Sequence, residues 1–379
     1  MRRHVFAGPW DGTAYWLGEA TGFSRYLACT NSWSPVPDTG RTHEITPMGG
    51  ILIGGMLVVI RSPLPPREEG KRVVAVVREE GWRVIADEEP HLPNDGAAVA
   101  TDHEVFVWGN ERAREHRRPK RTVAARVDPI AGTIRPASTV RAPSPRTFPY
   151  AVWTGAGVVV WGGLGAHDEL LGDGAVWDPI TDAWRPMSAV QAPSPRESAA
   201  VVRMGERVAI VGGSAKTFRA LRSESSSDAS LGDGALYDPA TDTWEPIADQ
   251  PDVRGTLVAL WSERDGLLAW NGAELARYDV TAKRWTRLPK IPAPPGRPRF
   301  RVREAPWPTA VVSPTEDAPG TIYRFDAVSQ RWQSAPLPPR TPAQIWFVAW
   351  LGDRMLVWAE EGEPEAGVLV GFVGVPEWS

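Results

Sequence analysis

Six arginines occupy equivalent places in the sequence. Each of them ends a loop just before a short apolar run. Guanidinium groups are permanently charged and bind carboxylate, phosphate or sulfate through paired hydrogen bonds. If these side chains converge, they form a site for an anion. Alternatively, they bond neighbouring backbone carbonyls or carboxylates and serve the fold. The six candidates for ligand binding are Arg41, Arg146, Arg196, Arg254, Arg299 and Arg340.

A second, smaller set of residues could move protons. His43 is followed by Glu44, His167 lies beside two carboxylates, and Glu197 follows one of the six arginines. These four are the candidates for acid and base catalysis. The histidines show no metal-ligand spacing, and Cys29 is the only cysteine, which excludes an intrachain disulfide or a thiolate zinc site. Nucleophile-elbow, Walker and dinucleotide motifs are also absent. We therefore predict no metal site and no cofactor.

The composition excludes a helical protein. The 379 residues include 36 glycines, 37 prolines and 19 tryptophans, so the two helix breakers make up about a fifth of the chain, against roughly 12% in average proteins. Charged residues are 23% and the net charge is -4, which fits a folded chain and argues against a nucleic-acid binder. The sequence therefore predicts a folded chain made mainly of strands and turns.

Neither the start of the chain nor its apolar runs indicate a membrane protein. The first ten residues break at Gly8-Pro9 before any long apolar run, so we predict no signal peptide. The longest apolar run, residues 51–60, is about half of a membrane span. The interpretation is a cytoplasmic protein that does not contact a membrane.

The elements that must position these residues follow from an internal repeat. A stretch that begins at Val158 and ends at Trp184 recurs, slightly longer, from Val208 to Trp244. Weaker copies fill the rest of the chain, so that the eight units close at positions 33, 82, 134, 184, 244, 285, 332 and 378. We predict a single domain, residues 1–379, with eight repeat units at about 1–38, 39–90, 91–140, 141–190, 191–250, 251–290, 291–339 and 340–379.

Each unit contains short valine-rich and aromatic runs bounded by glycine, proline or aspartate, which is typical of strands. Four antiparallel strands in roughly fifty residues make one blade of a β-propeller. The Asp-Pro-x-Thr segment suits a tight turn between the third and fourth strands, and the tryptophan that follows suits packing between blades. The predicted fold is an all-β propeller. Eight blades are favoured, and seven are possible if the two ends share one.

The repeat resembles the kelch family. The resemblance lies in the diglycines Gly162-Gly163 and Gly212-Gly213, the aromatic pair Tyr237 and Trp244, and the Pro195-Arg196 step. It covers residues 146–250 well and the ends of the chain weakly. It implies a propeller that binds a ligand at one mouth of its central axis. Some relatives are copper oxidases, whose ligand set has no match here, and others are isomerases or lyases.

Propeller topology places two classes of loop at the same mouth: those that enter the first strand and those that join the second strand to the third. The six arginines belong to the first class. The second class includes a basic run at 112–121, which could hold an acidic partner or be a solvated hairpin tip, and a serine-rich segment within 214–231. Variable loops on a regular scaffold usually carry specificity.

Two functions remain open at this stage. The first is a binding module that holds a small anion or an acidic peptide or protein at an arginine-rich mouth. The alternative is an enzyme, such as an isomerase, cyclase or lyase, acting on an anionic metabolite in the same funnel. We expect a monomer in either case, with no nucleic-acid partner.

Overall fold

The chain is all-β in a computed structural model, as the sequence predicts. The structure describes residues 6–10, 14–19, 22–27, 30, 32–37, 50–61, 73–78, 80–86, 92–93, 95–112, 119–217, 229–249, 253, 258–262, 265–271, 274–292, 302–303, 308–312, 320–337, 341, 344–351, 354–361 and 368–374. Within these residues there is no α-helix, and hence no helix able to span a membrane.

The strands follow one another in antiparallel sheets along the chain. The first sheets contain β1 (Phe6–Trp10), β2 (Ala14–Glu19), β3 (Gly22–Leu27) and β4 (Ser32–Val36); β5 (Gly50–Ile53), β6 (Met56–Arg61), β7 (Val73–Arg78) and β8 (Gly81–Ala86); β9 (Asp95–Ala100), β10 (Val105–Arg112), β11 (Pro119–Asp128) and β12 (Thr133–Pro136); and β13 (Tyr150–Trp153), β14 (Val158–Trp161), β15 (Gly174–Asp178) and β16 (Ala183–Pro186). In each sheet the strands lie side by side in chain order.

The second half of the chain repeats this order until its last two sheets. Its strands are β17 (Ala200–Met204), β18 (Arg207–Val211), β19 (Gly234–Asp238) and β20 (Thr243–Ile247); β21 (Val258–Ser262), β22 (Gly266–Trp270), β23 (Leu275–Asp279) and β24 (Arg284–Arg287); β26 (Thr309–Val312), β27 (Thr321–Asp326) and β28 (Arg331–Pro336); and β25 (Val302–Arg303), β29 (Gln344–Leu351), β30 (Arg354–Glu361) and β31 (Val368–Gly374). Here β25 leaves its neighbours in sequence and pairs in parallel with β29.

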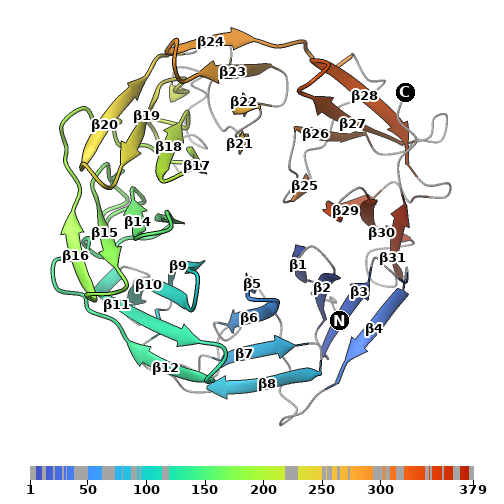
Figure 1. Ribbon diagram of the computed structural model, residues 1–379, viewed down its shortest axis with the longest axis horizontal. Coiled ribbons are helices and arrows are strands. Elements are labelled where there is room, and N and C mark those ends of the chain that lie inside the picture. Colours follow the sequence, from blue (N-terminus) through green and yellow to red (C-terminus); the bar gives the residue numbers. More distant parts are fainter. Residues whose placement is uncertain are drawn as a thin grey trace.

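Figure 1 shows the sheets arranged as the blades of a propeller, with the first strand of most sheets nearest the centre and the outermost strand at the rim. The first and the last sheet of the chain are neighbours in the ring, since the sheet of β1 lies beside the sheet of β29 (Figure 1). The number of blades and the boundaries of the repeat units remain predictions.

The hydrophobic core lies between neighbouring sheets. One buried cluster joins Phe106 and Trp108 of β10 to Trp177 of β15, and another joins Trp161 of β14 to Tyr237 of β19. Four of the closing tryptophans also tie their sheets to the preceding stretch of chain, because their indole N–H groups donate to backbone carbonyls there. The bonds run from Trp184 to Ser138, from Trp244 to Ser188, from Trp285 to Ala248 and from Trp332 to Pro289.

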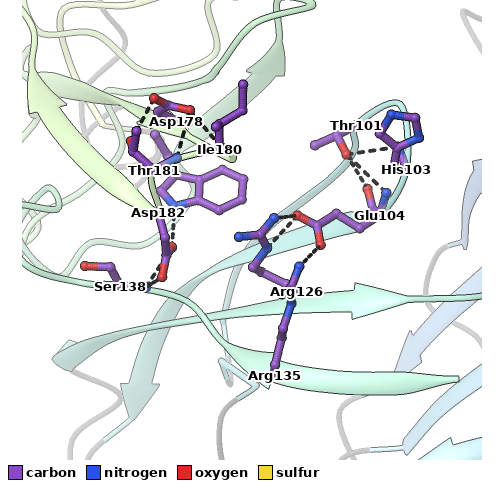
Figure 2. A network of polar contacts seen from close by, with 11 residues as sticks. Thr101, His103, Glu104, Arg126, Arg135, Ser138, Asp178, Ile180, Thr181 and Asp182 are labelled. Atoms are coloured by element: carbon purple, nitrogen blue, oxygen red, sulfur yellow. Dashed lines mark hydrogen bonds and ion pairs between the residues drawn. The ribbon is translucent and has the colours of Figure 1, made fainter. Parts of the chain in front are cut away.

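One construction recurs in five of the turns between a third and a fourth strand, those that begin at Asp128, Asp178, Asp238, Asp279 and Asp326. Its first aspartate accepts hydrogen bonds from the next turn amides, as Asp178 does from the N–H groups of Ile180 and Thr181 (Figure 2). Its fifth residue has a positive φ, at 50° in Asp182 and 51° in Lys283. The same amide bonds recur at Asp128, Asp238, Asp279 and Asp326. The sequence prediction of a tight, aspartate-stabilised turn is confirmed here.

Candidate functional site

Arg146 is held inside its own sheet. Its side chain is fully buried, and its Nη1 and Nη2 donate to the two carboxylate oxygens of Asp173 at 2.9 and 3.0 Å. Nη1 also donates to the carbonyl of Gly162 at 3.2 Å, while Nε and Nη2 donate to the carbonyl and hydroxyl of Ser144. Every nitrogen of the guanidinium therefore has an acceptor within the protein.

Arg196 repeats this arrangement in the next sheet. It is also fully buried, and it donates to Asp233 at 3.0 and 3.2 Å, to the carbonyl of Gly212 and to Ser194. We call each set of contacts an arginine clamp: an arginine before the first strand, a diglycine after the second, and an aspartate before the third.

The diglycine makes room for the clamp. Gly163 has a φ of 96°, and a Cβ on it would lie 2.6 Å from the carbonyl oxygen of Thr147. Thr147 and Leu164 in turn exchange two backbone hydrogen bonds of 2.8 Å. The loop that enters β13 and the loop that leaves β14 are thus joined at one end of the sheet. Only glycine allows this approach without strain.

These contacts support the structural alternative for two of the six arginines. An anion would have to displace Asp173 or Asp233 to reach either guanidinium. Their assignment as ligand-binding residues remains a prediction that this geometry does not favour. Arg41, Arg254, Arg299 and Arg340 lie outside the described residues.

A hollow of about 430 Å³ lies beside the two clamps, within the size range of ligand pockets. Its walls come from three consecutive sheets and include Gly96, Phe148, Tyr150, Gly163, Glu197 and Ser198, together with Arg196, one of the predicted ligand-binding residues. All of these lie at the end of the sheets where the first strands begin. The hollow therefore occupies the mouth that the repeat predicts as the binding face.

Phe148 and Ser198 occupy equivalent positions, two residues after the clamp arginines. Both have left-handed backbones, with φ of 53° and 58°, and both are exposed. The Phe148 residue is 65% accessible. A bulky residue held at positive φ is strained, and such strain tends to collect at functional sites. The fold thus displays an aromatic ring and a hydroxyl at the mouth.

Tyr150 adds a second ring to the wall. Its hydroxyl oxygen accepts a hydrogen bond of 2.7 Å from the N–H of Ala199. Burial raises the pKa of the phenol above its usual value of 10.0, and the nearby carboxylate of Glu197 raises it further, against the effects of the amide and of Arg196. The hydroxyl therefore keeps its proton at neutral pH.

The four candidates for catalysis are not brought together in the described residues. Glu197 lines the hollow, and its backbone pairs with Ser214. His167 is exposed in the loop after β14, where its N–H donates to Glu169 at 2.7 Å. His43 and Glu44 lie outside the described residues, and within the described residues no three His, Cys, Asp or Glu side chains gather in a metal-ligand group.

Sequence reasoning missed Phe148 and Asn110. Phe148 lies at a fixed distance after an arginine, a signal that the repeat contains but that does not indicate exposure or a positive φ. Asn110 is fully buried, and its side chain bonds both the N–H and the carbonyl of Arg146 in the next sheet. It takes the place of the second glycine of a diglycine, so an aligned repeat does single it out.

Sequence comparison adds no relative to this geometry. No family model matches the chain, and no curated protein is significantly similar to it. The function is therefore inferred from the side chains described above.

Proposed function

We propose that this protein is a kelch-like β-propeller that acts as a binding module, and that its ligand enters the hollow between the sheets of β9, β13 and β17. The observation that carries the proposal is the pair of equivalent residues Phe148 and Ser198. The fold holds both in a strained backbone conformation and leaves both exposed beside one cavity.

The chemistry of the walls favours binding over catalysis. The ring of Phe148 offers an apolar face, and Ser198 and Glu197 offer polar groups that can orient a ligand. Of the residues predicted to move protons, only Glu197 lines the hollow among those that the structure describes. Recognition therefore depends on these wall residues, while the buried clamp arginines hold the loops that carry them.

The test is a thermal-shift screen of amino-acid amides, sugar acids and short peptides of either charge, because a ligand that binds only the folded state raises its melting temperature. The variant is Phe148→Asn, which removes the ring and keeps a residue that tolerates a positive φ. The matched control is Ile180→Asn, since Ile180 is 92% exposed in a turn at the opposite end of the sheets.

At least one compound should stabilise the wild type and Ile180→Asn but not Phe148→Asn. A compound that stabilises all three proteins equally binds elsewhere. If every stabilising compound behaves in that way, or if none stabilises the wild type, the proposal is wrong.

A further inference from the structure

The hydroxyl group of Tyr150 has a proton for which the described part of the protein offers no acceptor. Its oxygen accepts a hydrogen bond of 2.7 Å from the N–H of Ala199, just before β17 in the next sheet. No described residue accepts a hydrogen bond from the hydroxyl itself. Because a phenol both donates and accepts, one hydrogen bond remains to be made by this group.

This hydroxyl lies at the wall of the hollow. The ring of Tyr150 stacks on Trp161, with 6.3 Å between the ring centroids, and its hydroxyl reaches the stretch 196–199 of the next sheet. Tyr150, Glu197 and Ser198 all line the hollow. Ser198 is exposed, and its hydroxyl makes no hydrogen bond to any residue that the structure describes. Two hydroxyl groups on this wall are therefore available to a ligand.

The surroundings of the Tyr150 hydroxyl disfavour a negative charge. Burial is the largest cause of the raised pKa of this phenol, and the charge of Glu197 raises that pKa more than the charge of Arg196 lowers it. An anionic group bound to the hydroxyl would meet the same two effects. Among the described residues that line the hollow, Arg196 is the only basic one, and its guanidinium already pairs with Asp233. These observations favour an uncharged acceptor over a carboxylate or a phosphate.

The neighbouring part of the wall is apolar. Phe148, Pro149 and Leu164 line the hollow beside Tyr150, and the left-handed backbone of Phe148 leaves this residue exposed. A hydrocarbon group can pack against these side chains. A sugar fits the wall less well, because several of its hydroxyl groups would lie against apolar atoms without hydrogen-bond partners. The wall thus suits a ligand that carries one uncharged polar group on a hydrocarbon.

We propose that the hollow binds an uncharged carboxamide, whose carbonyl oxygen accepts a hydrogen bond from the hydroxyl of Tyr150 and whose hydrocarbon group packs against Phe148. The N–H of the amide can donate to the hydroxyl oxygen of Ser198, which accepts as well as donates. An amide therefore supplies the acceptor that the tyrosine lacks without bringing a charge. The inference rests on the proposed function for where the ligand lies, and it adds the chemical class of the ligand.

The probes are phenylacetamide, phenylacetate and phenethylammonium, which share a ring and a spacer and differ in the polar group. Each is titrated by isothermal titration calorimetry. The variant is Tyr150→Phe, which removes the hydroxyl and keeps the ring against Trp161. The control is Tyr278→Phe, the same change in a tyrosine that does not line the hollow and whose buried hydroxyl has no hydrogen-bond partner among the described residues.

The wild type and Tyr278→Phe should bind phenylacetamide more tightly than phenylacetate, because burial and Glu197 oppose a negative charge at the hydroxyl. They should bind phenethylammonium weakly or not at all, since burial opposes either charge and this probe has no acceptor. In Tyr150→Phe the affinity for phenylacetamide should fall about three- to tenfold, the usual loss for one neutral hydrogen bond. The weaker binding of the ammonium probe should not change.

Tighter binding of either charged probe to the wild type overturns the inference. It is also overturned if phenylacetamide keeps its affinity in Tyr150→Phe, or if all probes lose affinity alike there, since Tyr150 then acts only on the shape of the wall. A charged probe that binds and loses affinity in Phe148→Asn leaves the proposed function standing. If no probe binds the wild type, the inference fails, and the broader thermal-shift screen decides the proposed function.

Discussion

The β9–β12 and β13–β16 sheets differ at one point, the end of the second strand. In the latter, the chain leaves Trp161 through Gly162-Gly163, both at positive φ, and wraps around the guanidinium of Arg146. In the former, the chain leaves Trp108 through Gly109-Asn110 and stays paired with β11 as far as Arg112, which lies opposite Pro119. The two residues that follow this tryptophan therefore decide the path of the chain. Gly162-Gly163 turns it back over its own sheet, and Gly109-Asn110 lets the strand continue outward.

The two arrangements differ in the hydrogen bonds that they allow, at the equivalent tryptophans of the second strand and between neighbouring sheets. The loop after β14 supplies the carbonyl of Gly172 to the indole N–H of Trp161 at 2.9 Å. The equivalent indole N–H of Trp108 is buried and has no hydrogen-bond partner within the described residues. In exchange, the side chain of Asn110 reaches the next sheet and holds the backbone of Arg146. The diglycine therefore allows hydrogen bonds within its own sheet, whereas Asn110 forms hydrogen bonds to the next sheet.

The largest effect is expected from breaking the clamp, with Arg146→Ala. The change leaves the carbonyls of Ser144, Gly162 and Asp173 without their donor, at about 1–3 kcal/mol for each that stays buried, and opens a cavity where a fully buried side chain stood. The carboxylate of Asp173, which is 63% exposed, returns to water. Urea unfolding measures the loss, with Arg331→Ala as the exposed control. If the midpoint stays the same while ligand binding is lost, Arg146 is a binding residue and the structural interpretation is wrong.

A smaller effect is expected from Asn110→Ala. The change leaves the N–H and the carbonyl of Arg146 buried without their bonds to Asn110, and such unsatisfied groups cost about 1–3 kcal/mol each. The loss of stability should be below that of Arg146→Ala, because the guanidinium keeps Asp173. Hydrogen exchange should also speed up at the Arg146 amide. Slow exchange in the variant would show that Asn110 does not hold this loop.

The strands and turns were predictable from the sequence because they depend on local patterns. Valine-rich runs, turn aspartates and tryptophans recur in most of the repeat units, and in the described residues they form the strands, the tight turns and the packing between sheets. The residues between 146 and 250 carry the clearest repeat, and they also hold both described clamps. In this region the residues that define the repeat are also the residues that make the contacts of the clamps.

The candidate site was harder to predict, for a physical reason. An arginine before a strand suits an anion site or a buried clamp equally well, and only the positions of Asp173 and Asp233 decide between them. These aspartates are distant in sequence from their arginines, and no local pattern pairs them. The exposure of Phe148 likewise depends on how three sheets meet.

A further difference lies between the β17–β20 and β21–β24 sheets, at the fifth residue of the turn. The hydroxyl of Tyr237 donates to Asp242 at 2.7 Å, and the N–H of Ser188 donates to the same carboxylate. In the next sheet the equivalent of Asp242 is Lys283. The hydroxyl of Tyr278 is buried there and has no hydrogen-bond partner within the described residues. The turn therefore lacks one acceptor.

The smallest effect is expected from Lys283→Asp, which supplies that acceptor. A new hydrogen bond contributes about 0.5–1.5 kcal/mol, and aspartate tolerates the φ of 51° better than lysine does. The change also removes the ion pair of Lys283 with the half-buried Glu245 and places a carboxylate near that residue, which costs about 0–1 kcal/mol. We expect a net gain of about 0.5–1 kcal/mol in the free energy of unfolding at pH 7.

The pH dependence of this gain in stability distinguishes a hydrogen bond from the Tyr278 hydroxyl from other reasons why a substitution of Lys283 could stabilise the protein. Burial opposes ionisation of Asp242, but bonds from Tyr237, Ser188 and Arg185 prevail and hold its pKa below 3.8. A carboxylate with a lowered folded pKa stabilises fully above its unfolded value and loses that contribution as pH falls through the folded one. If the new carboxylate behaves like Asp242, the gain from Lys283→Asp should begin to fall below about pH 3.8 and be lost once the carboxylate takes up a proton in the folded protein. The uncharged companion Lys283→Asn should keep its gain. If neither variant is more stable at pH 7, the Tyr278 hydroxyl does not limit the stability of this sheet.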